Sequence, residues 1–234
     1  MAFTAADVMR RANTILQDVG AVRWMYSELH DWLNEAMRAI VTVKPNAKTE
    51  SVVLILASGT KQSLPAQYSM LSRVVRNMGV NGTTPGKAIR TLASRDILDA
   101  QIPGWHSTDT LPFSAVVDYA LQDPMSPREF YVVPGNLGTG RIEAIVGVIP
   151  APIPAPAGAL ALDVANYTAA VPMDDIYQGI LLDLVLFRAF SKDSAAPDAA
   201  QRASAHLSLA NQALQALGGA QLSVSMGNNA ASAG

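Results

Sequence analysis

Residues 51–65 read SVVLILASGTKQSLP, and the hydrophobic pattern of the chain changes at this stretch. A run of β-branched and aliphatic residues leads into Ser58–Gly59 and a more polar return, which is typical of two strands joined by a tight turn. The sequence therefore predicts a β-hairpin here, at the start of a β-rich region that begins near Lys48.

Before this stretch, apolar residues recur with the spacing of helices. One helix is expected over residues 4–19, where Thr4 and Asp7 have the spacing of a capping box. A second helix is expected over residues 27–43, ending before Pro45. Each helix is amphipathic and cannot bury its apolar stripe alone, so each must pack against another element.

After this stretch, the sequence predicts a short helical piece over residues 67–77 and then a mostly β region as far as residue 167. Four prolines in residues 149–156 indicate an extended connector, because each proline fixes φ and removes a hydrogen-bond donor. Strands are expected near residues 88–92, 114–119, 129–133 and 141–148, with loops rich in Pro and Gly between them.

Residues 119–134, YALQDPMSPREFYVVP, combine carboxylates, an arginine, aromatic residues and prolines in one short span. The segment QDPMSP has turn chemistry, and REFYVV has the composition of a strand. We therefore expect Asp123 and Pro124 to set a turn, with Phe130 and Tyr131 on opposite faces of the strand that follows.

Two further helices are expected at the C-terminal end, over residues 174–191 and 197–217. Together the pattern predicts an α+β protein in which a helical bundle is built from the N- and C-terminal helices and carries an inserted, mostly β domain. The expected divisions are a bundle of residues 1–47 and 172–218, an inserted domain of residues 48–171, and an extended C-terminal tail of residues 219–234.

Composition excludes several classes of function. The net charge is −2 and the chain has no cysteine, so we expect no strong grip on nucleic acid, no disulfide and no thiolate zinc site. The N-terminus lacks the apolar core of a signal peptide, and the longest apolar helical run, residues 180–190, is too short and too charged to cross a membrane.

Several motifs suggest chemistry but do not have the required spacing. NGTTPGKA (residues 81–88) places its glycines too close together for a phosphate loop, and GNLGTG (residues 135–140) does not match a dinucleotide turn. The three histidines, His30, His106 and His206, have no paired ligand at helical spacing.

Two pairs of carboxylates, Asp96 with Asp99 and Asp118 with Asp123, are an open alternative as an acid–base pair. No partnered nucleophile accompanies them. We therefore expect no enzyme, no catalytic, cofactor-binding or metal-binding residue, and no cofactor.

Taken in order along the chain, a set of segments resembles the head-to-tail adaptor proteins of tailed bacteriophages, also called connector or tail tubular proteins. The resemblance spans residues 24–217, and it is carried by the ordered set rather than by any single motif. The segments are WLNEAMRAIVTVKPNA (residues 32–47), VLILASGTKQSLP (53–65), VVRNMG (74–79), RDILDAQIPGWH (95–106), QDPMSPREFYVVP (122–134) and RAFSKDS (188–194).

This resemblance implies a structural virion protein made in the host cytoplasm and located at the head–tail junction. It implies a ring, typically of about twelve copies, that sits beneath the portal protein, extends the DNA channel and docks the tail or nozzle proteins. Double-stranded DNA would pass through without specific binding, and no membrane is involved. The alternative from a different class is a tail-associated module that recognises a carbohydrate or protein ligand.

Six residues are candidates for contacts with a partner. Leu222, Val224 and Met226 alternate with serines in the tail, a pattern that suits a strand added to the sheet edge of another chain. The other three are the aromatic residues Trp105, His106 and Tyr131, for which packing in the core of the β domain is the competing interpretation.

Overall fold

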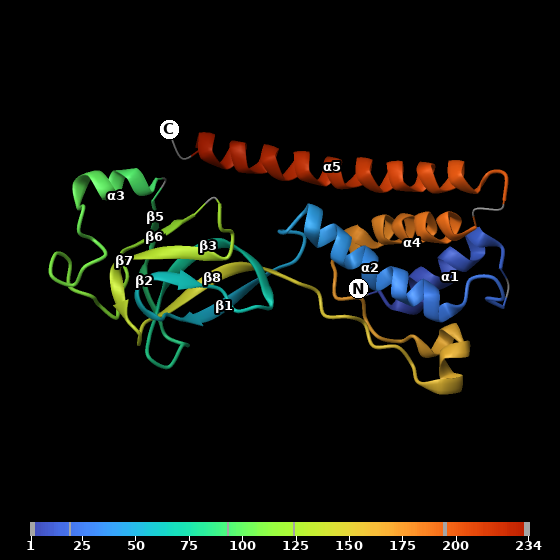
Figure 1. Ribbon diagram of the computed structural model, residues 1–234, viewed down its shortest axis with the longest axis horizontal. Helices are drawn as coiled ribbons and strands as arrows, with labels where there is room; N and C mark the ends of the chain where they lie inside the picture. Colours follow the sequence, from blue (N-terminus) through green and yellow to red (C-terminus); the bar gives the residue numbers. More distant parts are fainter. Residues whose placement is uncertain (1–2, 19, 93, 124, 194–195, 232–234) are drawn as a thin grey trace. The chain divides into compact units, whose positions relative to one another are not determined.

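A computed structural model describes residues 3–231, except 19, 93, 124 and 194–195, with residues 219–231 described as backbone only. The protein is a mixed α+β structure with five α-helices and two β-sheets (Figure 1). It divides into two compact units, one formed by residues 1–44 and 150–234 and the other by residues 45–149.

The first unit is helical. Its α-helices are α1 (Ala5–Leu16), α2 (Tyr26–Val43), α4 (Gln178–Lys192) and α5 (Ala199–Ala231), and its short 3-10 helices are η1 (Gly158–Leu162), η2 (Val164–Asn166) and η3 (Asp175–Tyr177). Helix α4 contacts α1, α2 and α5, and seven of its residues are buried. The apolar character of α4 on nearly all faces therefore reflects its central position in this unit.

The predicted capping box at the start of α1 is confirmed. The Thr4 hydroxyl accepts a hydrogen bond from the Asp7 backbone, and the Asp7 carboxylate accepts one from the Thr4 backbone at 2.8 Å. The predicted end of this helix at residue 19 is wrong, because Gln17 adopts a left-handed conformation with φ of 55° and closes the helix at Leu16.

The proline-rich connector belongs to the helical unit, whereas the sequence placed it in the β domain. His30 on α2 contacts the Ile153 carbonyl at 2.9 Å, and the Asn34 side chain accepts a hydrogen bond from the Ile153 backbone at 2.8 Å. Farther along, the Tyr167 carbonyl accepts a hydrogen bond from Ala6 at 3.0 Å. These contacts hold residues 150–171 against α1 and α2, which moves the boundary from residue 171 to residue 150.

Helix α5 also differs from its predicted extent. It continues as a helix to Ala231, in place of the extended tail expected from residue 219. No proline occurs between Ala199 and Ala231 to interrupt the backbone hydrogen bonds, so glycine alone does not end the helix.

The second unit is a pair of four-stranded sheets. One sheet has the order β1–β8–β3–β4 and the other the order β2–β7–β6–β5. The strands are β1 (Thr49–Ile55), β2 (Ser58–Ser63), β3 (Tyr68–Met78), β4 (Pro85–Ala88), β5 (Arg90–Thr91), β6 (Tyr119–Gln122), β7 (Glu129–Leu137) and β8 (Arg141–Val148), and the unit also contains helix α3 (Arg95–Gln101).

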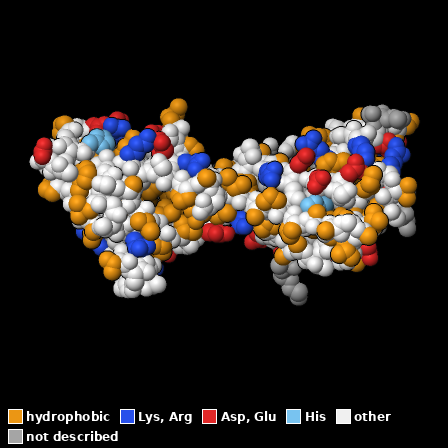
Figure 2. All heavy atoms as spheres, turned by 60° about the horizontal axis from the view of Figure 1, so that its bottom comes forward, with side chains coloured by type: hydrophobic (Ala, Val, Ile, Leu, Met, Phe, Trp, Pro, Cys, Tyr) orange, Lys and Arg blue, Asp and Glu red, His pale blue; other side chains and the backbone are white. Residues whose placement is uncertain are grey.

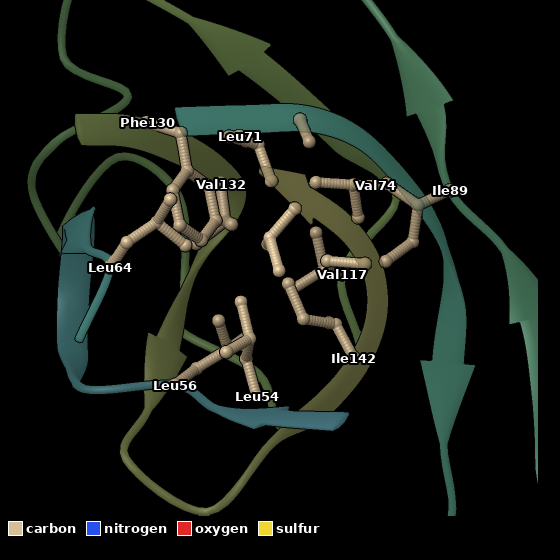
Figure 3. Packing of buried hydrophobic residues seen from close by; sticks show 13 residues of the cluster. Leu54, Leu56, Leu64, Leu71, Val74, Ile89, Val117, Phe130, Val132 and Ile142 are labelled. Atoms are coloured by element: carbon tan, nitrogen blue, oxygen red, sulfur yellow. The ribbon is translucent and has the colours of Figure 1, made fainter. Parts of the chain in front are cut away.

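The predicted hairpin of residues 51–65 is wrong. Strand β1 pairs with β8, and β2 pairs with β7, so the two strands lie in different sheets. The Gln62 side chain stabilises the connection between β1 and β2. It accepts a hydrogen bond from the Ala57 backbone at 2.7 Å and donates one to the Ala57 carbonyl at 2.9 Å. Leu54 and Leu56 thereby point into the space between the sheets together with Phe130 and Val132 (Figure 3).

The helical piece predicted over residues 67–77 is also wrong, because these residues form β3. Three register shifts interrupt the pairing of β3 with β8. Each shift adds a residue to the strand, so inward positions recur every three residues at Leu71, Val74 and Asn77. This spacing imitates that of a helix.

Other strand predictions differ in extent. Strands β7 and β8 match the predicted positions, whereas residues 114–119 contain only an isolated bridge at Ser114 before β6 begins at Tyr119. Helix α3, within a region expected to be β and loops, was not predicted.

Candidate interaction surface

The turn before β7 positions the aromatic residues of that strand. The Asp123 carboxylate accepts a hydrogen bond from Met125 at 2.9 Å, and its carbonyl accepts one from Ser126 at 3.1 Å. The predicted role of Asp123 in the turn is therefore confirmed, and Pro124 lies outside the described residues. Phe130 then lies in the core between the sheets, whereas Tyr131 lies on the opposite face of β7 and is half-buried.

Tyr131 belongs to a group of side chains that we call the Trp105 cluster, made of Arg95, Trp105, His106 and Tyr131. Trp105 is fully buried against Leu98 of α3 and makes an edge contact with the Tyr131 ring, with centroids 5.8 Å apart. The ring of His106 lies against Trp105 at a centroid distance of 3.6 Å. The structure thus brings together three of the six candidate residues.

Arg95 covers the aromatic rings from α3. Its guanidinium lies 5.3 Å from the centroid of the Tyr131 ring and 5.9 Å from that of Trp105, within the range of cation–π attraction. Asp99, one turn along α3, accepts a hydrogen bond from the Trp105 indole at 2.8 Å and one from Arg95 at 3.1 Å. The indole hydrogen bond, followed by the charge of Arg95, lowers the pKa of the Asp99 carboxyl.

His106 is exposed but is fixed by two hydrogen bonds. One ring nitrogen lies 3.3 Å from the Arg95 guanidinium and the other 2.7 Å from the Thr60 hydroxyl. Because a guanidinium only donates, the nitrogen facing Arg95 accepts, and the other carries the proton that it donates to Thr60. Partial burial, and then the positive charge of Arg95, lower the pKa of His106 and so favour the neutral form of the ring.

A cavity of about 270 Å³ lies beside this cluster. Its lining combines the aromatic face of Tyr131 with the side chains at the start of α3 and at the end of β6, namely Ser94, Arg95, Asp96, Leu121, Gln122 and Asp123. The outer part of the cluster therefore combines an aromatic ring, a cation and hydrogen-bonding groups at one accessible place, which is the residue chemistry of protein interfaces.

The six candidate residues differ in burial and in whether the structure describes their side chains. Trp105 has no exposed surface, so it supports the cluster from beneath, and His106 and Tyr131 supply the accessible part. The side chains of Leu222, Val224 and Met226 lie outside the part of the chain that the structure describes.

The acidic residues singled out in the sequence have structural partners. Asp118 forms an ion pair with Lys87 at 2.6 Å, and Asp123 sets the turn described above. Asp99 accepts a hydrogen bond from Trp105, while the Asp96 backbone N–H donates to the hydroxyl of Ser94, the N-cap residue of α3. The two pairs therefore do not meet as an acid–base pair.

The remaining two histidines lie in the helical unit. His30 is buried against the connector, and His206 forms a hydrogen bond with Asp183 at 2.9 Å and stacks on Phe190. Among the described residues there is no group of three or more His, Cys, Asp or Glu side chains that could hold a metal ion. Over the same residues, no helix has both the length and the apolar character needed to cross a membrane.

Two asparagines were missed by the sequence reasoning, although they organise the β unit. Asn136 is fully buried and makes four hydrogen bonds, donating to the Ser114 and Ala115 carbonyls and accepting from Gly138 and Gly140. Asn77 similarly donates to the Val117 carbonyl at 2.7 Å and accepts from the Val117 backbone at 2.8 Å. The only signal in the sequence was that each asparagine lies among apolar residues of a strand, where a polar side chain needs hydrogen-bond partners.

Charge on the surface is mixed. Within the part of the chain that the structure describes, ten of the 17 Lys and Arg residues form ion pairs with carboxylates. Figure 2 shows cationic and anionic side chains interspersed on the face that it draws. Most of these cationic side chains thus have a carboxylate partner, which competes with the phosphate groups of nucleic acid for binding to them.

Comparison with known proteins supplies one match. The model of a family described as SU10 adaptor protein matches residues 3–232, which include nearly the whole chain and both units. No curated protein matches the chain.

Proposed function

The chain belongs to the SU10 adaptor protein family, and we propose that it forms a closed ring at the head–tail junction of a tailed bacteriophage. The family is one of structural phage adaptors, which is not a class of enzymes, and it makes the protein a component of the virion. In the proposed ring the chain sits beneath the portal, extends the channel through which DNA is ejected, and docks the tail or nozzle proteins.

The observation that carries this proposal is the extent of the family match. It covers the helices at both ends of the chain and the β unit between them, so both units lie within the matched region. A small binding module inserted into an unrelated protein would be matched over one unit alone.

Ring closure places a requirement on the subunit. In a cyclic ring of more than two copies each subunit contacts its neighbours through two different surfaces. We assign one contact to the accessible part of the Trp105 cluster, His106 and Tyr131. We assign another to the C-terminal segment with Leu222, Val224 and Met226, which contacts a neighbouring copy or the portal.

The charge distribution suits a channel. A strongly basic lumen would bind the phosphates of passing DNA and slow its movement. The net charge of −2 and the many paired cations favour DNA that slides past without being held. We propose about twelve copies, as in the proteins that the chain resembles, and a helical bundle centred on α4 as the rigid part of each subunit.

Mixing the purified chain with portal rings of the same phage tests the proposal. Light scattering after gel filtration, followed by negative-stain imaging, is expected to show the chain as an added ring on the portal. A chain that remains monomeric in the presence of portal, or that binds a tail carbohydrate without portal, would contradict it.

A further inference from the structure

The outer edge of β1 is an unoccupied strand edge. The Val148 backbone donates to the Lys48 carbonyl, and the Leu56 backbone donates to the Gly140 carbonyl. The backbone N–H and C=O groups of the even-numbered residues of β1 therefore point toward β8. Because the backbone groups of successive residues alternate in direction, those of Thr49, Ser51, Val53 and Ile55 point away from the sheet. Among the described residues, none makes a backbone hydrogen bond to these outward groups.

The other three edges of the two sheets have features that block strand addition. Strand β2 has a register shift between Gly59 and Lys61, and Lys61 extends from it into solvent. Strand β4 begins with Pro85 and also has a register shift, and β5 is only two residues long. Bulges, lysine, proline and short length are the devices by which proteins protect sheet edges.

Strand β1 has none of these devices in its seven described residues. It pairs with β8 without a register shift and contains no proline, and its one charged residue, Glu50, lies near one end. Its outward-facing Val53 and Ile55 are 41% and 65% exposed. An edge of this kind is a ready template for pairing with another chain.

A cavity of about 330 Å³ opens at the same side of the sandwich. It is lined by residues of β1 and β2 together with Pro65 and Tyr68, and the buried side chains of Leu54, Leu56 and Phe130 are part of its lining. A strand added beside β1 would direct every second side chain toward this cavity. The edge therefore fits an extended segment with apolar side chains at alternate positions.

We propose that the β1 edge accepts, as an added strand, the C-terminal segment of a neighbouring copy of this chain, residues 221–226. This proposal rests on the proposed ring and names the surface that receives the C-terminal segment. The sequence there reads QLSVSM, with apolar Leu222, Val224 and Met226 at alternate positions. In an extended conformation these three side chains would share the face turned toward the cavity, and the serines would face outward beside Val53.

The length of α5 makes this segment available. Helix α4 has 15 residues and α5 has 33, so at 1.5 Å per residue they span roughly 22 Å and roughly 50 Å. The 15 residues of α4 can therefore cover less than half the length of α5, which it contacts.

The composition of the segment also favours a change of conformation. Gly218, Gly219 and Gly227 flank it, and glycine is the least favourable helix-forming residue after proline. Pairing with β1 would supply the backbone hydrogen bonds that the segment loses when its helix unwinds.

Disulfide trapping tests the pairing directly, because the chain has no cysteine of its own. One copy carries Val53→Cys, and a second copy with a different tag carries Ser223→Cys or Ser225→Cys. The two are assembled together with portal rings and oxidised mildly. Opposed residues of paired strands lie within disulfide distance, so we expect a mixed dimer that contains both tags for at least one of the two serines.

The matched control is Lys61→Cys on the protected edge β2, which should give about tenfold less mixed dimer. Rings that form without a Val53 crosslink, or that crosslink equally well through Lys61, would overturn the β1 assignment and leave the proposed ring intact. Failure of the unsubstituted chain to form rings would refute the proposed function, and this inference with it.

A second variant tests whether the edge is needed for assembly. The Val53 backbone N–H points away from β8, so Val53→Pro removes an edge donor and keeps the β1–β8 hydrogen bonds. We expect Val53→Pro to reduce ring assembly about tenfold in sedimentation, whereas Val53→Thr assembles normally. If the proline variant does not fold, Val53→Lys replaces it, and normal assembly of a folded Val53→Pro or Val53→Lys protein would overturn the proposal.

Discussion

His106 makes the stability of the β unit depend on pH. Partial burial and the neighbouring Arg95 lower its pKa, so the unfolded chain binds a proton at a higher pH than the folded chain does. The contribution of the neutral ring to stability is therefore complete above the ordinary histidine pKa near 6.5 and is lost as the pH falls through the lowered value. We expect thermal melts to show the unsubstituted protein losing stability as the pH falls below about 6.5.

The control for this prediction is His106→Gln, which keeps a polar side chain but does not titrate. The difference in melting temperature between the two proteins should shrink or reverse as the pH falls. A difference that stays constant across this range would show that His106 does not titrate differently in the folded state.

Lys44 lies in the helical unit and is expected to lower its stability. Its ammonium group is buried and has no hydrogen-bond partner among the residues that the structure describes, and burial lowers its pKa. A weak compensation comes from the Tyr177 ring, whose centroid is 5.9 Å away. Lys44→Met retains the apolar stem and removes the charge, so we expect the free energy of unfolding to increase by about 1–2 kcal/mol.

Chemical denaturation measures this change. The exposed Lys87, which pairs with Asp118 on the surface, provides the comparison, because Lys87→Met should leave stability nearly unchanged. A loss of stability in Lys44→Met would indicate that the ammonium group has a favourable interaction in the folded protein.

The alternation of β7 has a measurable consequence for the β unit. Phe130 is 1% exposed in the core between the sheets, whereas Tyr131 is half-buried on the other face. Phe130→Ala should therefore reduce the free energy of unfolding by about 3–5 kcal/mol, and Tyr131→Ala by clearly less. Equal effects of the two substitutions in urea denaturation would mean that the two faces of β7 are not distinct.

Helices were easier to predict than strand partners. The spacing of apolar residues and the Thr4–Asp7 pair are local signals, so α1, α2 and α4 were predicted close to their observed positions. Partners in a sheet depend on contacts far apart in sequence. Residues 51–65 contain every local feature of a hairpin, yet β1 and β2 pair with β8 and β7 because Leu54 and Leu56 must both reach the space between the sheets.

The Trp105 cluster was predictable only in part. The sequence indicates that Trp105, His106 and Tyr131 belong to the β region, and aromatic residues are natural candidates for both cores and interfaces. It does not indicate that Thr60 and Arg95 fix the ring of His106, because residue 60 and residue 106 are brought together by the sheet. The sequence also does not show which of these residues lie in the core and which lie at the surface: Trp105 is buried, whereas His106 is exposed.

For the whole protein, the charge distribution predicts weak binding to DNA. With a net charge of −2 and ten cations already paired, we expect no complex with double-stranded DNA below about 100 µM chain at about 150 mM salt. Gel-shift titration at several salt concentrations measures this. Micromolar binding with a steep dependence on salt would show a basic surface and would contradict a channel that lets DNA slide.

The central claim is that this family member builds a closed ring on the portal, and the mass of the complex tests it most directly. Native mass spectrometry of portal rings incubated with an excess of the chain should show one discrete species. Its added mass should be a fixed multiple, about twelve, of the 24.7 kDa subunit, with no partially filled series at saturation. A broad distribution of added masses, or portal rings with no added mass, would contradict the account.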